Sequence, residues 1–330
     1  MKDFNPNAPA NPNSGIFGLP YNSNESEVIL IQVPWDATAS HKTKTALAPA
    51  AILSASKQVD LFHYKFGNLY SRGIYLESIN SEIKKIKNKT SKVSAKNRTQ
   101  LNQLTTKLEK IIYLDVKKIL KEGKIPGIIG GDHSVSLGAI KACSDEKEIG
   151  VLQFDAHADL RKSFDGIKHS HASIMFNVIN ESKIINLTQI GVREFCQEEF
   201  DFIKSNNKIK TYFDRELFNR KSEGESWRTI SAEIINNLPE YLYISLDIDF
   251  FDIKLCPNTG TPVPGGLDYN EFLYFVESVA TVKKIIGFDL VEVSPNPVNQ
   301  LDESIGARAL YELCLCALKS KSLNSNNYRD

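Results

Sequence analysis

The chain of 330 residues has few cysteines, no net charge and no long hydrophobic run. Its five cysteines are odd in number and form no C-x-x-C pair, which argues against a disulfide framework or a thiolate zinc site. Forty basic residues balance forty acidic ones, so no broad attraction to nucleic acid or to an anionic membrane surface is expected. No apolar run approaches the length of a membrane span. These absences favour a cytoplasmic globular protein with no nucleic acid and no membrane among its partners.

The organisation of the chain is simple. The first residues are rich in Asn and Pro and lack the basic lead and apolar core of a signal peptide, so we expect residues 1–14 to form a loose arm. No internal repeat or linker follows, and residues 15–330 are expected to form a single domain. Segment 81–98 holds seven basic residues and one acidic residue, without interleaved aromatics. This composition favours a solvated helix or excursion over a nucleic-acid patch.

Short apolar runs alternate with longer amphipathic ones. Six runs have the β-branched, apolar character of strands covered on both faces: 28–33, 126–130, 150–154, 184–190, 241–246 and 285–291. Helices are expected at 106–122, 134–143, 305–319 and from a cap at Asp268 to about residue 280. The alternation predicts an α/β fold with three layers, in which helices cover both faces of a mostly parallel sheet.

Polar residues follow several of these strands directly. Asp155, His157 and Asp159 alternate after one strand, and Asp247 and Asp249 alternate after another. Side chains two positions apart in an extended segment point to the same side, so each set can converge on one spot. The carboxyl ends of parallel strands are also where open α/β sheets place their sites. The spacing therefore predicts one centre built from separate segments.

The chemistry of these side chains indicates metal ions. Carboxylate and imidazole ligands without thiolate favour a borderline-hard divalent cation, with manganese as the leading candidate. The four aspartates carry enough charge to balance two divalent ions, and together with His157 and His133 the set is too large for one. The sequence therefore predicts a binuclear centre with two Mn²⁺ ions, which would make hydroxide available near neutral pH.

Three blocks of the sequence resemble the signatures of the arginase/agmatinase superfamily of manganese ureohydrolases. The blocks are Gly130-Gly131-Asp132-His133-Ser134, Phe154-Asp155-Ala156-His157-Ala158-Asp159 and Ser245-Leu246-Asp247-Ile248-Asp249. The resemblance extends from about Val28 to Leu318 and implies an arginase-like fold. It also implies that His133, Asp155, Asp159 and Asp247 hold one ion and that Asp155, His157, Asp247 and Asp249 hold the other.

The same resemblance assigns catalytic roles, because the family hydrolyses guanidinium groups. Glu292 resembles the family glutamate that holds the substrate cation, and His171 resembles its proton-shuttling histidine. Asp249 would orient the attacking hydroxide or relay its proton. His169 lies two residues from His171, and the sequence alone leaves it open as the shuttle.

Within the superfamily the chain looks closest to agmatinase. Asp159-Leu160-Arg161, Ser170-His171-Ala172-Ser173 and the stretch around Pro257–Pro262 follow that pattern, and the polar donors that bind the amino-acid head of arginine were not found. The expected reaction is hydrolysis of agmatine to putrescine and urea, as in polyamine biosynthesis. Guanidine, a guanidino acid, arginine or formiminoglutamate would suit the same centre.

Two positions depart from the family pattern, since Lys44 and Ala48 stand where glycines are usual in a loop that should wall the cleft. Two rival interpretations stay open: a one-zinc deacetylase and a metal-stabilised subunit without activity. Family members are usually trimers or hexamers, so the resemblance also implies a homo-oligomer.

Overall fold

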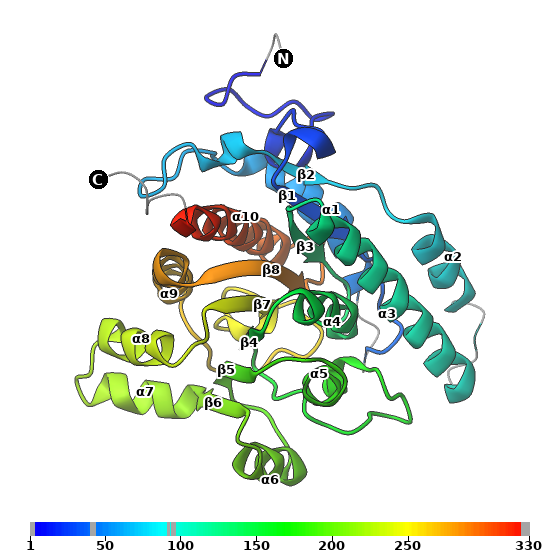
Figure 1. Ribbon diagram of the computed structural model, residues 1–330, viewed down its shortest axis with the longest axis vertical. Coiled ribbons are helices and arrows are strands. Elements are labelled where there is room, and N and C mark those ends of the chain that lie inside the picture. Colours follow the sequence, from blue (N-terminus) through cyan, green and yellow to red (C-terminus); the bar gives the residue numbers. More distant parts are fainter. Residues whose placement is uncertain (1–3, 40–43, 91–92, 94–96, 325–330) are drawn as a thin grey trace.

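The computed structural model describes residues 4–39, 44–90, 93 and 97–324. Within these ranges eight strands form a single sheet in the order β2-β1-β3-β8-β7-β4-β5-β6, and every neighbouring pair is parallel (Figure 1). The strands are β1 (Val28–Gln32), β2 (Ile74–Leu76), β3 (Ile125–Ile129), β4 (Ile149–Phe154), β5 (Asn186–Val192), β6 (Ile209–Phe213), β7 (Tyr241–Asp247) and β8 (Lys284–Val291).

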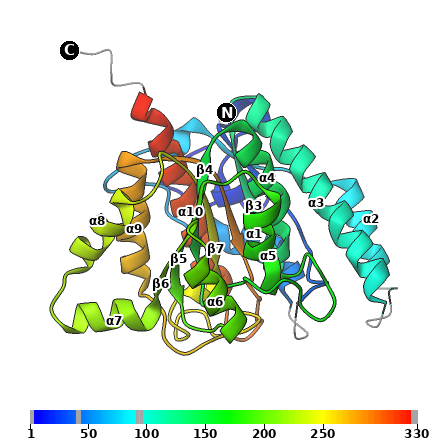
Figure 2. The same cartoon turned by 60° about the horizontal axis from the view of Figure 1, so that its bottom comes forward.

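Helices cover both faces of the sheet, so the predicted three-layer α/β/α fold is confirmed (Figure 2). One core contains apolar residues of α1 (Ala48–Ala55), α7 (Asp214–Ser222), α8 (Trp227–Asn236), α9 (Tyr269–Val282) and α10 (Leu301–Lys321). The other contains those of α2 (Ser81–Thr90), α3 (Arg98–Lys121), α4 (Ser136–Glu146), α5 (Ile174–Glu181) and α6 (Gln197–Ser205). No helix in the described ranges is both long and apolar enough to cross a bilayer.

The apolar strands are explained by the two helix layers. Along β1, Val28 and Leu30 enter one core, whereas Ile29 and Ile31 enter the other. Because successive side chains of a strand point to opposite faces, a strand between two helix layers must be apolar at every position. The same reasoning explains the continuous apolar runs in the central strands.

Most of the expected elements are present with shifted ends. The helix expected at 106–122 begins earlier, at Arg98, where the side chain of Asn97 caps it. Asp268 caps α9 through a reciprocal capping box with Glu271, as the sequence indicated. The basic segment contains α2, which buries Ile83 and Ile86 while its lysines remain on the outer side. The expected helix is thus present at residues 81–90, whereas residues 91–92 and 94–96 of the segment lie outside the described residues.

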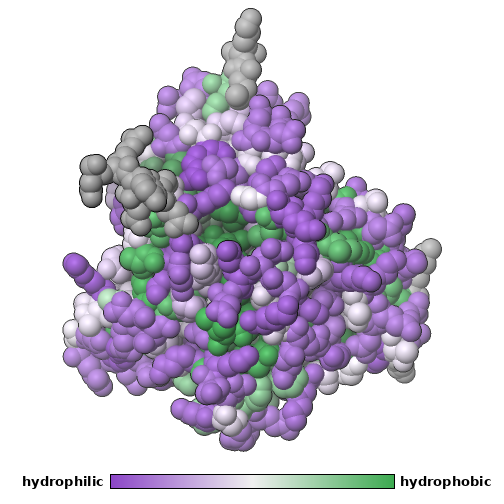
Figure 3. All heavy atoms as spheres, in the orientation of Figure 1, coloured by the Kyte–Doolittle hydropathy of each residue, from purple (hydrophilic) through white to green (hydrophobic). Residues whose placement is uncertain are grey.

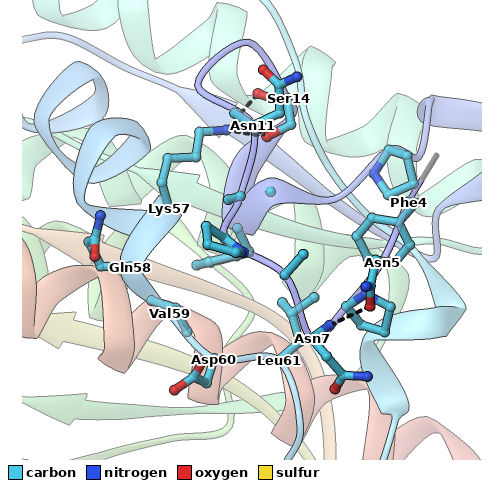
Figure 4. A pocket seen from close by; sticks show the side chains of 17 residues that line it. Phe4, Asn5, Asn7, Asn11, Ser14, Lys57, Gln58, Val59, Asp60 and Leu61 are labelled. Atoms are coloured by element: carbon cyan, nitrogen blue, oxygen red, sulfur yellow. Dashed lines mark hydrogen bonds between the residues drawn. The ribbon is translucent and has the colours of Figure 1, made fainter.

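The N-terminal residues lie beside the loop 57–61, and together they line a hollow of about 600 Å³ (Figure 4). The ammonium group of Lys57 donates hydrogen bonds to the carbonyl oxygen and hydroxyl of Ser14. The ring of Phe4 packs edge-on against Tyr70. None of the candidate site residues lines this hollow. Hydrophilic side chains cover most of the face shown in Figure 3.

Candidate metal centre and active site

Candidate site residues lie at the carboxyl ends of four neighbouring strands. His133 begins a short 3-10 helix after β3, Asp155 follows β4, Asp247 ends β7 and Glu292 follows β8. The strands β3, β8, β7 and β4 are adjacent and parallel, so their carboxyl ends meet. The structure therefore places these side chains where ligand sites of parallel sheets occur.

The first group of candidate ligands surrounds the imidazole of His133. Its Nδ1 lies 3.1 Å from Asp155 Oδ2, 3.0 Å from Asp159 Oδ2 and 3.4 Å from Asp247 Oδ2. This nitrogen is buried and makes no hydrogen bond of acceptable geometry within the described parts of the chain. A ring nitrogen that faces three carboxylates in this way fits a cation between them.

The second group surrounds His157. Its Nδ1 lies 2.9 Å from Asp249 Oδ2 and 3.6 Å from Asp155 Oδ1. Asp155 thus presents one oxygen to each histidine, and the two groups share it. All six side chains that the sequence singled out as metal ligands are brought together.

Crowding of carboxylates dominates the electrostatics of the centre. Burial and the charge of Asp155 raise the pKa of Asp159 to about 7, and burial with the charges of Asp249 and Asp155 raises that of Asp247 well above its usual value. Burial lowers the pKa of His157, but Asp249 and Asp155 outweigh it and raise the value to about 12. Without metal ions, bound protons offset the negative charge of these carboxylates. Divalent cations would offset the same charge in their place.

Backbone hydrogen bonds hold the loops that carry the aspartates. Asp247 Oδ1 accepts from the amide of Asp249 (2.9 Å), and Asp249 Oδ1 accepts from the amide of Ala156 (3.0 Å). The guanidinium of Arg193 donates to the carbonyl oxygens of Asp249 (2.7 Å) and Phe251 (3.3 Å). Arg193 therefore braces the turn after β7 from the neighbouring loop.

Glu292 lies against the first group. Its Oε1 accepts a hydrogen bond from the amide of His133 (2.9 Å), and its own amide donates to Gly131 (2.8 Å). Burial and the charge of Asp132 raise the pKa of Glu292 well above its usual value. A cation near this carboxyl would favour its ionised form.

His171 joins the site through Thr38. The amide of His171 donates to Thr38 Oγ1 (3.1 Å), and that hydroxyl donates to Asp132 Oδ2 (2.9 Å). Burial, together with the charges of His157 and His133, lowers the pKa of His171 to about 4. His169 instead pairs with Glu181 of α5, at 3.2 Å. Of the two candidate shuttles, the contacts favour His171.

The two departures from the family pattern fit the backbone without strain. Lys44 has φ of −108°, and Ala48 is helical with φ of −52°. Neither position uses the left-handed region for which glycine is preferred. The amide of Lys44 donates to the hydroxyl of Ser294 (3.4 Å), which ties this loop to the one after β8. Residues 40–43 of the same loop lie outside the described residues.

A third group of acidic and imidazole side chains, His63, Glu277 and Glu312, lies away from the centre. His63 Nδ1 accepts hydrogen bonds from the amides of Lys65 (3.2 Å) and Phe66 (3.0 Å), so Nε2 carries the hydrogen in the neutral ring. Nε2 points at Glu277 (3.3 Å) and Glu312 (3.5 Å) and has no lone pair for a cation. We interpret this group as a structural cluster of polar side chains.

Several residues around the centre were not assigned roles from the sequence. They are Thr38, Gln153, Arg193, Ser245 and Asp289. One signal was available for three of them, since Gln153, Ser245 and Asp289 are polar residues inside otherwise apolar strands. Thr38 and Arg193 lie in loops, where polar residues are ordinary and carry no such signal.

The chain is similar to known proteins over most of its length. The model of the arginase family matches residues 26–317. The chain is 28% identical over 293 residues to an N(1)-aminopropylagmatine ureohydrolase of Synechocystis sp., with 88% of each chain covered, and 27% identical over 292 residues to an agmatinase of Pyrococcus horikoshii, with 87% of this chain and 90% of that one covered. The crystal structure of a putative agmatinase from Clostridium difficile superposes with a TM-score of 0.71 at 27% identity, over 90% of this chain and 98% of that chain. The chain therefore belongs to the arginase family, and it is a ureohydrolase that cleaves C–N bonds of guanidino groups.

Proposed function

We propose that the protein hydrolyses agmatine to putrescine and urea with two manganese ions at the centre described above. The observation that carries this proposal is the convergence of six side chains from three segments into two groups that share Asp155. His133, Asp155, Asp159 and Asp247 would hold one ion, and Asp155, His157, Asp247 and Asp249 the other. Oxygen and imidazole ligands suit manganese.

The ions, when bound, would lower the pKa of water enough to supply hydroxide near neutral pH. The chain's own residues do the rest. A guanidinium group stays cationic and its carbon is a poor electrophile, so the substrate must be held in place for attack. Glu292 provides the opposite charge for this purpose, and its burial strengthens the attraction.

Departure of the amine requires a proton, and His171 would deliver it. Its pKa of about 4 makes the imidazole neutral at pH 7, so His171 must first accept a proton from the attacking nucleophile, directly or through Asp249. It then passes this proton to the leaving nitrogen. The C–N bond breaks, and urea and the free amine result with no other reactant than water.

Support for agmatine comes from the relatives and from the sequence of the cleft. One relative is named as an agmatinase and another as an N(1)-aminopropylagmatine ureohydrolase. The polar donors expected for the amino-acid head of arginine were not found between the second signature and His171. Both named substrates carry a guanidinium at one end and an amine at the other, and neither has a carboxylate.

The test is a urea-release assay with manganese-loaded protein. The panel contains agmatine, N(1)-aminopropylagmatine, arginine, guanidine, a guanidino acid and formiminoglutamate, and formamide is measured for the last. Agmatine is expected to give the highest kcat/KM. A higher kcat/KM for another member of the panel would overturn the assignment of agmatine as the substrate, but not the assignment of the protein as a ureohydrolase. Nickel replaces manganese in a parallel series, and Asp249→Asn serves as the inactive control.

The metal count separates the remaining alternatives. Two ions per chain are expected, whereas one zinc ion per chain would favour the deacetylase-type interpretation. Assembly into a trimer or hexamer and a cytoplasmic location both stay predictions.

A further inference from the structure

A row of buried polar side chains crosses five neighbouring strands beneath the candidate metal ligands. The strand register pairs Asp289 with Ser245, Ser245 with Gln153, Gln153 with Gln189, and Gln189 with Thr211. Four of these residues are fully buried and Thr211 is 8% exposed. We call them the polar row. By the alternation of side chains they face the helix layer that contains α4.

Burial of polar groups is costly unless they are hydrogen-bonded, and one half of the row is bonded toward Asp155. Thr211 Oγ1 donates to Gln189 Oε1 (2.7 Å), and Gln189 Nε2 donates to Gln153 Oε1 (2.6 Å). Gln153 Nε2 then donates to Asp155 Oδ2 (2.7 Å). The chain of bonds ends on the carboxylate that the two candidate ion sites share.

The other half of the row leads to His133. Ser245 Oγ donates to Asp289 Oδ1 (2.8 Å) and lies 2.9 Å from His133 Nε2. A hydroxyl has a single hydrogen, and Ser245 uses it in the bond to Asp289. Ser245 can then only accept from His133, which places the imidazole hydrogen on Nε2. The lone pair of Nδ1 is left facing the three aspartates, which is the form that a metal ion requires.

We propose that the polar row positions the metal ligands, with Asp289 acting through Ser245 to fix the tautomer of His133 and Gln153 acting on Asp155. This inference rests on the metal centre of the proposed function. Asp289 and Gln153 are positioning residues, because neither belongs to the six candidate ligands. The alternative is that the row only satisfies buried polar groups, in which case its loss would lower stability without a specific effect on either ion.

The substitutions follow from the direction of the bonds. Asp289→Asn keeps the shape but allows the amide to donate to Ser245, which frees the hydroxyl to donate to His133 and supports the wrong tautomer. Ser245→Ala removes the link altogether. Gln153→Met removes the donor to Asp155 at similar volume. Ser320→Ala is the matched control. The hydroxyl of Ser320 is buried and hydrogen-bonded like those of the row, but it lies on α10 and accepts from a backbone amide of β8 (3.0 Å).

Manganese binding measured by electron paramagnetic resonance of free Mn²⁺ tests the proposal, with thermal unfolding of the metal-free proteins alongside. Asp289→Asn and Ser245→Ala should each lower the affinity for one of the two ions about 10- to 100-fold and leave the affinity for the other nearly unchanged. Gln153→Met should weaken both, because Asp155 is shared. Ser320→Ala should lower the melting temperature without altering either affinity.

The outcomes separate this inference from the proposed function. A wild-type protein that binds two ions and hydrolyses its substrate, with row variants that bind both ions as it does, would overturn the role of the row alone. The role of the row would also be overturned if every variant, Ser320→Ala included, lost affinity for both ions in proportion to its loss of stability. A wild-type protein that binds no ion would overturn both.

Discussion

Two of the candidate site residues, Asp159 and Glu292, have backbone conformations that residues with a side chain rarely adopt. Their φ angles are 54° and 59°, in the left-handed region. Such a conformation costs about 1–3 kcal/mol and persists only where the surroundings impose it. At Asp159, the carbonyl oxygen accepts from the amides of Met175 (3.0 Å) and Phe176 (3.2 Å), and these two hydrogen bonds hold the backbone in this conformation. Strain at these positions is consistent with a role in the site.

We predict that Asp159→Gly separates stability from function. Glycine removes the backbone strain and also the repulsion between Asp159 and Asp155, so the metal-free protein should gain about 1 kcal/mol in its free energy of unfolding. Manganese affinity should fall at least tenfold, because a candidate ligand is lost. Urea denaturation in EDTA and a manganese titration measure the two effects. Asp165→Gly is the control, since Asp165 has φ of 49° but is exposed and pairs with Arg98.

A second prediction distinguishes the two histidines after β4. His171→Asn should retain both ions and lower kcat about 10²- to 10⁴-fold, which is the usual contribution of general acid–base catalysis. His169→Asn should keep most of the activity, because His169 pairs with Glu181 rather than facing the centre. Steady-state urea release and a metal count on both variants check this. If His171→Asn had a higher kcat than His169→Asn, His169 and not His171 would be the proton shuttle.

That the candidate ligands lie together was predictable at the level of residues because they occur in short blocks directly after strands, although Asp249 lies in a short 3-10 helix rather than in the extended segment that the spacing suggested. The polar row was harder to find. A lone Gln153, Ser245 or Asp289 in an apolar strand is visible in the sequence, but its partner lies on another strand at a register that local patterns do not give. Only the pairing of the strands shows that the three belong together.

At the scale of elements, central strands were predicted well and marginal ones were not. Six expected runs correspond to β1, β3, β4, β5, β7 and β8. The omitted strands lie at the two edges of the sheet: β2 has only three residues, and β6 has five and includes the exposed Lys210. Short or half-exposed strands lack the continuous apolar signal that two-sided burial imposes.

Helix α10 carries a prediction about pH, because it is buried on nearly all sides and includes Glu312. Burial and the charge of Glu277 raise the pKa of Glu312 to about 7 from an ordinary value near 4.5. The folded state therefore holds this proton more tightly than the unfolded state, and the stability it contributes is present below about pH 4.5 and lost as the pH rises through 7.

Glu312→Gln should remove this dependence. Relative to wild type, the variant should gain about 1–3 kcal/mol in unfolding free energy between pH 5 and pH 8.5. Urea denaturation at both pH values measures the difference. Glu148→Gln, which changes an exposed carboxylate, is the control and should show no such gain. Parallel curves for wild type and Glu312→Gln would contradict the assignment of this proton.

At the scale of the whole molecule, the metal-free protein confines several acidic groups in one buried place while its formal net charge is zero. Ions that bind only the folded state stabilise it by about 2.7 kcal/mol each at one hundred times their dissociation constant. We therefore predict that manganese raises the melting temperature and that EDTA reverses the change. Magnesium at the same concentration is the control. Equal melting temperatures with and without manganese would contradict the centre.

The order of the strands was beyond sequence reasoning. The blocks after β3 and β4 are separated by few residues along the chain, yet β8 and β7 lie between these strands in the sheet. Patterns in the sequence indicate that strands exist and that they are parallel, but the insertion of β8 depends on how the helices pack afterwards. The fold class was predictable, whereas the topology had to be observed.

This insertion bears on how the protein matures during synthesis. Strand β8 is the last of the described strands to leave the ribosome, and it joins β3 to β7. Before it arrives, His133 belongs to one fragment of sheet and the aspartates to another, so a nascent chain has no place to capture a pair of ions. By the ligand sets given above, the ion site that contains His133 would form only after β8 has joined the sheet, whereas the ligands of the other ion site all lie at the carboxyl ends of β4 and β7.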